Sequence, residues 1–335
     1  MEPDQRRYAQ LVLFALVLAL AVIMLGAYVR LSDAGLGCPD WPGCYGQLVV
    51  PDQANSIADA NRAYPDRPLE TSKAWKEMMH RYLAGALGLV ILVLVLWVWK
   101  SGWHGSLPRR LSLLLAVLIV FQVLLGMWTV TLLLKPLVVV LHLIGGMSIV
   151  ALLWLLWLRR CAVSAGENLR KHKPAALVAL MVLVVQIILG GWTSSNYAAT
   201  ACPDFPTCQQ SLWPEADYSE AFVLWRGLGV NYEGGVLETP ARVAIHFVHR
   251  LGAIAVLFTI GFLLVRSFPE SRGLERIALL AMTVLLLLQV SLGIGLIKFG
   301  FPMLTAVAHN GMAAFLLLSV VTVNYLAFAG SESSS

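Results

Sequence analysis

The sequence predicts an all-α integral membrane protein whose eight transmembrane helices form two parallel four-helix-bundle repeats. Of its 335 residues, 59% are hydrophobic and only 13% are charged, whereas about a quarter of the residues in a soluble chain are charged. Several apolar runs reach the roughly 20 residues that a helix needs to cross a bilayer. Motifs in the first half of the chain recur, in the same order, in the second half. These observations exclude an ordinary cytosolic enzyme, a disordered protein and a nucleic-acid binder.

Eight apolar segments are long enough to cross the membrane. They lie near residues 11–29, 82–99, 111–134, 137–158, 175–195, 243–265, 277–297 and 303–327. Most are apolar on every side, which is typical of helices surrounded by lipid and by other helices. The alternating pattern of a membrane β-barrel is absent. The first segment has no cleavage site of small residues and is too long for a signal peptide, so we expect it to be a span.

The placement of Lys and Arg predicts the orientation of the chain. Basic residues gather at the N-terminus and in the short loops at 100–110, 159–173 and 266–276, which share one side of an eight-helix protein. The positive-inside rule puts this side, and both termini, in the cytoplasm. The long loops near 31–79 and 196–241 then face outward. The net charge of +5 therefore reflects membrane topology rather than nucleic-acid binding.

Two pairs of motifs show that the chain repeats itself. They are GCPDWPGC at 37–44 with ACPDFPTC at 201–208, and QVLLGMW at 122–128 with QVSLGIG at 289–295. Four spans return the chain to its starting side, so the two halves run in the same direction, related by a pseudo-twofold axis along the membrane normal. We expect an N-terminal half at 1–160 and a C-terminal half at 174–328.

Four histidines occupy matched positions in the two halves. His80 begins the second span and His142 lies in the first turns of the fourth. His249 lies two turns into the sixth span and His309 in the first turns of the eighth. Each of these spans enters from the outer face, so we expect all four side chains at similar depth, toward the outside of the membrane.

Duplicated histidines at one depth favour metal binding. A single intramembrane histidine is as readily explained by a hydrogen bond to a neighbouring helix, but that explanation does not account for four. Two histidines on facing helices of a four-helix bundle suit the axial positions of haem iron. Zinc or copper would require a tighter cluster with a third or fourth ligand. A proton relay would require more intramembrane carboxylates than the sequence has.

Arg81 and Arg250 directly follow two of these histidines. An arginine at the outer face can bind a haem propionate in a bidentate manner. An arginine that only snorkels to the interface is equally common. The sequence leaves both interpretations open.

Glu77 distinguishes the two halves. It lies three residues before His80, on the same helical face, whereas His246 takes the corresponding place before His249. A glutamate at a helix entry is usually favoured by the helix dipole alone. The difference between otherwise matched halves favours a functional role for Glu77.

Four of the five cysteines form two close pairs, Cys38 with Cys44 and Cys202 with Cys208. Both pairs lie in outer loops, on the oxidising face of the membrane, which favours structural disulfides. A thiol–disulfide relay that delivers electrons is the alternative, although this spacing is not a recognised redox or zinc signature.

The combination of these residues resembles the haem A synthases of aerobic bacteria and mitochondria. The resemblance covers about residues 10–328 and includes EMMHR at 77–81, His142 in LHLIGG, HFVHR at 246–250, His309 in AHNGM and the two CPD loops. It implies an oxidoreductase of the bacterial cytoplasmic membrane that oxidises a methyl group of haem O to the formyl group of haem A. The product serves terminal cytochrome oxidases.

The resemblance also implies a different haem for each half. Resident haem b would lie between His249 and His309, and the substrate haem between His80 and His142, each beside the arginine that follows the first histidine. Glu77 matches the family's catalytically important carboxylate. No oxygen site is left on iron with two histidine ligands. Either one histidine dissociates, or the methyl group is oxidised at the ring edge, water captures the cation and Glu77 stabilises charge or accepts a proton.

Two other functions are compatible with parts of the pattern. A diheme b-type electron-transfer cytochrome would need matched halves, which the difference at Glu77 argues against. A transporter built from parallel repeats gives no reason for four ligands at one depth.

The expected partners are haem O and the lipid bilayer, with no nucleic acid. The sequence leaves open the electron-transfer partner, docking with the farnesyltransferase that makes haem O, and homo-oligomerisation.

Overall fold

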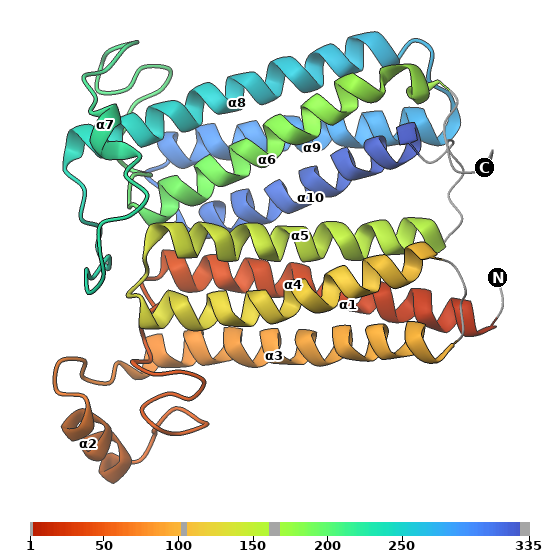
Figure 1. The fold of residues 1–335 in the computed structure, drawn as a ribbon. Coiled ribbons are helices and arrows are strands. Elements are labelled where there is room, and N and C mark those ends of the chain that lie inside the picture. Colours follow the sequence, from red (N-terminus) through yellow and green to blue (C-terminus); the bar gives the residue numbers. More distant parts are fainter. Residues whose placement is uncertain (1–2, 102–105, 161–167, 329–335) are drawn as a thin grey trace.

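The computed structural model describes residues 3–101, 106–160 and 168–328. This part of the chain contains helices and no strand, and eight helices are long and apolar enough to cross a membrane. They are α1 (Pro3–Leu31), α3 (Thr71–Lys100), α4 (Ser106–Thr131), α5 (Pro136–Arg160), α6 (Lys173–Ser195), α8 (Thr239–Ser267), α9 (Gly273–Lys298) and α10 (Met303–Phe328), labelled in Figure 1. The connections hold the short helices α2 (Ala54–Ala63), η1 (Leu169–His172) and α7 (Tyr218–Ala221). The prediction of an all-α membrane protein with eight spans is confirmed.

Helix α3 begins about three turns earlier than its apolar run predicts. Its first turns are amphipathic, and Ala74, Glu77 and Met78 are buried while the residues between them are more exposed. His80 therefore lies well inside the helix, and the expectation that it begins the span is wrong. The reason is that these polar turns are stabilised by an outer loop, which a count of apolar residues does not detect.

The long helices pack as two groups of four. Helices α1, α3, α4 and α5 contact one another, as do α6, α8, α9 and α10, and the groups meet through α1 and α5 on one side and α6 and α10 on the other. Within the shared interface, Trp154 Nε1 donates a 2.8 Å hydrogen bond to Thr322 Oγ1. Each group has an apolar core of its own, centred on residues such as Ile91 in the first and Ile260 in the second. The pseudo-twofold relation and the division at 1–160 and 174–328 stay predictions.

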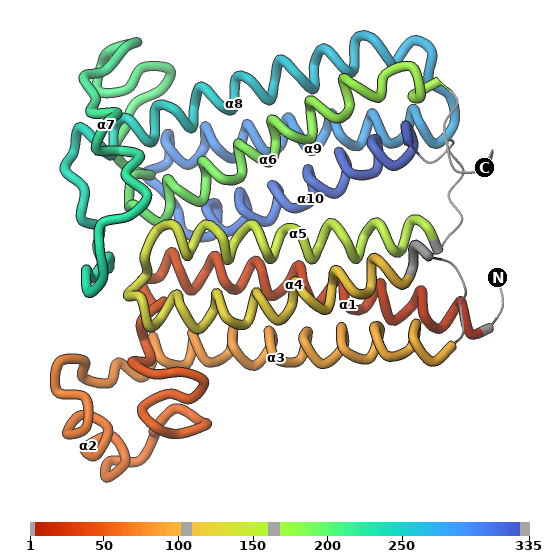
Figure 2. The backbone as a smooth tube through the Cα atoms, viewed as in Figure 1, coloured from red at the N-terminus to blue at the C-terminus, as the bar shows by residue number. Residues whose placement is uncertain are grey.

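The start of α1 and the end of α10 lie at one end of the bundle, and the long loops with α2 and α7 lie at the other (Figure 2). An even number of spans requires this arrangement. Which end faces the cytoplasm stays a prediction.

Cations tie the two groups together at the loop end. Arg30, at the end of α1, donates a 2.8 Å hydrogen bond to the Ser194 carbonyl oxygen of α6, and its guanidinium lies 4.1 Å from the centre of the Tyr197 ring. Likewise, Lys135 between α4 and α5 lies 3.2 Å from the centre of the Trp225 ring. Burial lowers the pKa of Lys135. Both cations use aromatic faces contributed by the second group.

Candidate active site

The first group of helices brings two of the predicted ligands close together. His80 of α3 and His142 of α5 have ring centroids 6.4 Å apart, with ring planes at 77°. Two imidazoles on opposite sides of one metal, each with a metal–nitrogen bond of about 2.0 Å, place their centroids about 6.3 Å apart. The spacing of this pair therefore fits axial ligation of one iron.

The second group carries the other two predicted ligands. His249 lies on α8 and His309 on α10, and a glutamine of the preceding helix approaches each of them. Gln186 Nε2 lies 3.1 Å from His249 Nδ1, and Gln289 Nε2 lies 3.3 Å from His309 Nε2. The chemistry of this donor set, two imidazoles in apolar helices, fits a bis-histidine haem.

Each of the four rings rests against a glycine of a neighbouring helix. A Cβ at any of these glycines would lie 2.9 to 3.4 Å from a histidine Cε1. The pairs are Gly26 with His80, Gly126 with His142, Gly190 with His249 and Gly293 with His309. All four histidine residues are half-buried. Each histidine ring thus packs with one face against the backbone of a glycine, in a space that a larger residue would fill. Each histidine residue also retains accessible surface.

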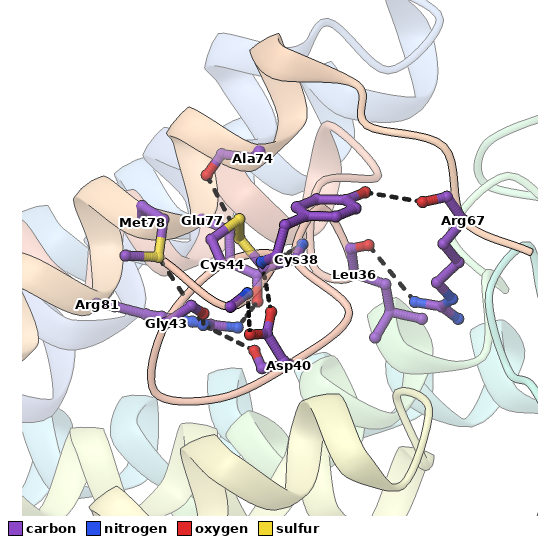
Figure 3. The surroundings of a disulfide bond; sticks show 12 residues. Leu36, Cys38, Asp40, Gly43, Cys44, Arg67, Ala74, Glu77, Met78 and Arg81 are labelled. Atoms are coloured by element: carbon purple, nitrogen blue, oxygen red, sulfur yellow. Dashed lines mark hydrogen bonds and ion pairs between the residues drawn. A yellow bond between two sulfur atoms is a disulfide. The ribbon is translucent and has the colours of Figure 1, made fainter. Parts of the chain in front are cut away.

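Glu77 lies between the helix bundle and the first cysteine loop (Figure 3). Its side chain is 5% exposed. The Cys38 backbone N–H donates a 2.9 Å hydrogen bond to Glu77 Oε2, and Arg81 Nη2 donates a 2.6 Å hydrogen bond to Glu77 Oε1. Arg81 also donates through Nη1 to the carbonyl oxygens of Asp40 and Gly43. The carboxylate is therefore buried, paired and linked to the loop on both sides.

The corresponding residues of the second half also contact the backbone of the second loop, with His246 in the place of the carboxylate. Arg250 donates to the carbonyl oxygens of Thr207, at 2.7 Å, and Cys202, at 2.9 Å. His246 is buried with Nδ1 3.2 Å from the Ala198 carbonyl oxygen. Both arginines thus hold loop carbonyls, and propionate binding by either stays a prediction. The buried Nε of Arg250 has no hydrogen-bond partner in the described structure and is a donor open to a ligand.

The two cysteine loops have the same construction. Disulfides close them at Cys38–Cys44 and Cys202–Cys208, which confirms the predicted pairing. Inside each loop an aspartate accepts backbone N–H groups, Asp40 from Tyr45 at 2.7 Å and Asp204 from Gln209 at 2.7 Å. The hydrogen bond from the Thr207 hydroxyl holds the pKa of Asp204 below its ordinary value. Each loop lies at the loop end of one helix group.

The sequence matches the family described as cytochrome oxidase assembly protein over residues 9–321. The chain belongs to this family. It is 47% identical over 323 residues to a heme A synthase of Shewanella oneidensis, a match that covers 96% of both chains.

Two more distant heme A synthases also match most of this chain. The chain is 24% identical to a heme A synthase of Halalkalibacterium halodurans, covering 89% of this chain and 90% of the relative. It is 28% identical to one of Rhizorhabdus wittichii, covering 95% and 93% respectively. This member of the cytochrome oxidase assembly family therefore matches its relatives along the whole length of the bundle.

The sequence analysis did not identify the glutamines and glycines that surround the histidines of this family member. The signal was present, because a Q-x-x-x-G pattern begins at Gln122, Gln186 and Gln289. Two of these segments had been recognised only as evidence for the repeat. A glutamine within an apolar span is a costly polar group, and that cost should have drawn attention to it.

Opening the first loop of this family member is expected to lower its stability modestly. The double change Cys38→Ser with Cys44→Ser removes a cross-link between residues six apart, which is worth about 2 kcal/mol in the loop-entropy account. Thermal unfolding in detergent measures the loss.

Thiol labelling without reductant should leave all four paired cysteines of the wild type unmodified. Cys161, outside the described residues, is the positive control for labelling, and rapid labelling of all five cysteines would contradict the structural role.

Proposed function

We propose that this protein is a haem A synthase, a multi-pass membrane oxidoreductase that converts a methyl group of haem O to the formyl group of haem A. The observation that carries the proposal is the pairing of His80 and His142 at the spacing of two axial ligands, next to the buried carboxylate of Glu77. The heme A synthase of Shewanella oneidensis, 47% identical over 96% of the chain, supports it.

The two histidine pairs take different haems in this proposal. His249 and His309 hold a resident haem b, and His80 and His142 bind haem O and release haem A. Bound haem supplies redox chemistry that no side chain can provide. The net reaction converts methyl and water to formyl, four protons and four electrons, and the electrons pass to an electron-transfer partner.

The residues around each histidine pair account for the different roles that we propose for the two pairs. Glu77 is an ion-paired carboxylate one turn from His80, so it can stabilise positive charge or hold a proton near the substrate. The second pair has His246 in that place, hydrogen-bonded to the loop and without an acidic group. The half without a carboxylate suits passive storage of an electron.

The cellular setting follows from the charge distribution and the haem chemistry. We place the chain in the bacterial cytoplasmic membrane with both termini in the cytoplasm, where the basic loops gather. Docking with the farnesyltransferase that makes haem O would pass this apolar substrate through the bilayer. A homo-oligomer is compatible with the large apolar surface of the helices.

Extraction of porphyrins from membranes with and without this protein tests the function. We expect haem A only in membranes that contain both the protein and a source of haem O, as identified by mass and by the absorption of the pyridine complex. A diheme electron-transfer cytochrome, which the matched cradles of the four histidines would also permit, predicts a b-type spectrum and an unchanged set of pigments. That second result would overturn the proposed function.

A further inference from the structure

Three glutamines in apolar spans occupy equivalent places beside the histidines. Each lies four residues before a glycine that seats a histidine, so that the two side-chain positions share one helix face. The segments are QVLLG at 122–126 on α4, QIILG at 186–190 on α6 and QVSLG at 289–293 on α9. The corresponding segment of α1 is VIMLG at 22–26, in which a valine replaces the glutamine.

The glutamine side chains reach the histidine-bearing helices. Gln122 Nε2 donates a 2.7 Å hydrogen bond to the His142 carbonyl oxygen. Gln186 Nε2 lies 3.0 Å from the His249 carbonyl oxygen and 3.1 Å from His249 Nδ1. Gln289 Nε2 lies 3.3 Å from a ring nitrogen of His309. The polar end of each glutamine is thus within reach of its imidazole or of the turn that carries it.

The amide oxygens of these glutamines are open acceptors. Oε1 of each is buried and has no hydrogen-bond partner in the described structure, as is also true of the Nδ1 atoms of His80, His142 and His309. A histidine that binds a metal through one ring nitrogen keeps a proton on the other, which it donates to an acceptor. A half-turn of the amide exchanges its oxygen and nitrogen. For Gln186, that turn would bring Oε1 to the place of Nε2, 3.1 Å from His249 Nδ1, and for Gln289 to a place 3.3 Å from His309 Nε2.

Two glycines make room for these amides. A Cβ at Gly145 would lie 2.1 Å from Gln122 Oε1, and a Cβ at Gly252 would lie 2.1 Å from Gln186 Oε1. Each glycine lies three residues after a histidine, His142 or His249, on the same helix. The glutamine amide therefore fits against the helical turn that carries the histidine only because a glycine, which has no side chain, occupies this position.

We propose that Gln186 and Gln289 are positioning residues that fix the orientation and tautomer of His249 and His309 for a tightly held haem. In this proposal His80 is the exchangeable ligand, since Val22 meets its imidazole with backbone only and has no amide side chain. The second pair thus has two amides and the first pair only one, on His142. The proposal rests on the proposed function and adds the reason why one haem stays and the other leaves.

The change Gln186→Leu tests the positioning role in the full-length protein. We expect the haem b retained through purification to fall about tenfold, the scale of losing a group that orients a metal ligand. The haem that remains should have a higher midpoint potential and altered electron paramagnetic resonance, because its imidazole is a weaker donor. Gln186→Glu keeps an acceptor oxygen and should restore retention with a lower potential. Wild-type retention, potential and spectrum in Gln186→Leu would overturn the proposal.

Matched variants separate this role from a general effect on folding. Gln122→Leu makes the same change in the first pair and should leave haem b unaltered, and equal loss of haem b in both variants would overturn the proposal. Gly252→Ala displaces the Gln186 amide and should reproduce Gln186→Leu. Gly261→Ala on the same helix, where a Cβ meets nothing within 4 Å, should behave as wild type.

The converse change, Val22→Gln, provides an amide for His80. We expect haem O and haem A to copurify with this variant in higher amounts than with the wild type, with slower release of haem A. Unchanged occupancy in a variant that elutes as a folded protein would overturn the role assigned to Val22. A wild-type protein that purifies without any haem would instead overturn the proposed function itself.

Discussion

Replacing His249 or His309 by alanine strips the tightly held haem b from the purified protein, whereas replacing His80 or His142 leaves that haem in place. Haem per protein should fall by at least about tenfold in the first two variants, because loss of an axial bond costs more than the ~1.4 kcal/mol that a factor of ten in affinity represents. All four variants should fail to convert haem O. The pyridine complex of the extracted haem measures the content, and chromatography of the porphyrins measures conversion.

His246→Ala is the matched control for these histidine variants. His246 belongs to the same helix as His249, but its ring faces the Ala198 carbonyl oxygen of the outer loop. We expect this variant to keep haem b. Loss of the tightly held haem from the His80 and His142 variants instead would show that the assignments of the two halves must be exchanged.

Glu77→Gln is expected to abolish most turnover while haem b content stays at the wild-type value. Glutamine keeps an acceptor for the Cys38 N–H but removes the negative charge that pairs with Arg81. Loss of a group that handles a proton or a developing charge typically costs two or more powers of ten in rate, so haem A formation should fall at least about 100-fold. The initial rate with saturating haem O provides the measurement.

A loop variant distinguishes this catalytic role from simple support of the outer loop. Asp40→Asn weakens the acceptor that holds the Tyr45 N–H in the same loop and leaves the carboxylate of Glu77 untouched. We expect this variant to retain most of the activity. If it is as inactive as Glu77→Gln, the carboxylate acts only by holding the loop in place.

The spans and the histidines were predictable from the sequence for a physical reason. A bilayer requires long apolar runs, so hydropathy alone gives the number of helices. Within such runs a histidine is costly and therefore stands out. The cysteine pairs were predictable because short, duplicated spacings in outer loops favour local disulfides.

The partners of the site residues were not predictable in the same way. Glu77 binds the backbone of Cys38, 39 residues earlier, and no periodicity within α3 reports such a contact. The early start of α3 at Thr71 depends on the same loop. The contacts of the arginines with loop carbonyls were not predictable, because a sequence shows the charge of a group and not which backbone atoms fold back to meet it.

Residues of each half contact the other half at the loop end. These contacts imply that the halves do not depend on the covalent connection between α5 and α6 to stay together. Arg30 of the first half holds backbone of the second, while loop 222–235 of the second half covers Lys135 of the first and donates from Tyr232 N–H to the Leu133 carbonyl oxygen. Together with the contact between α5 and α10, these interactions let each half cover part of the surface of the other. Two separately encoded four-helix chains would already recognise each other through these contacts.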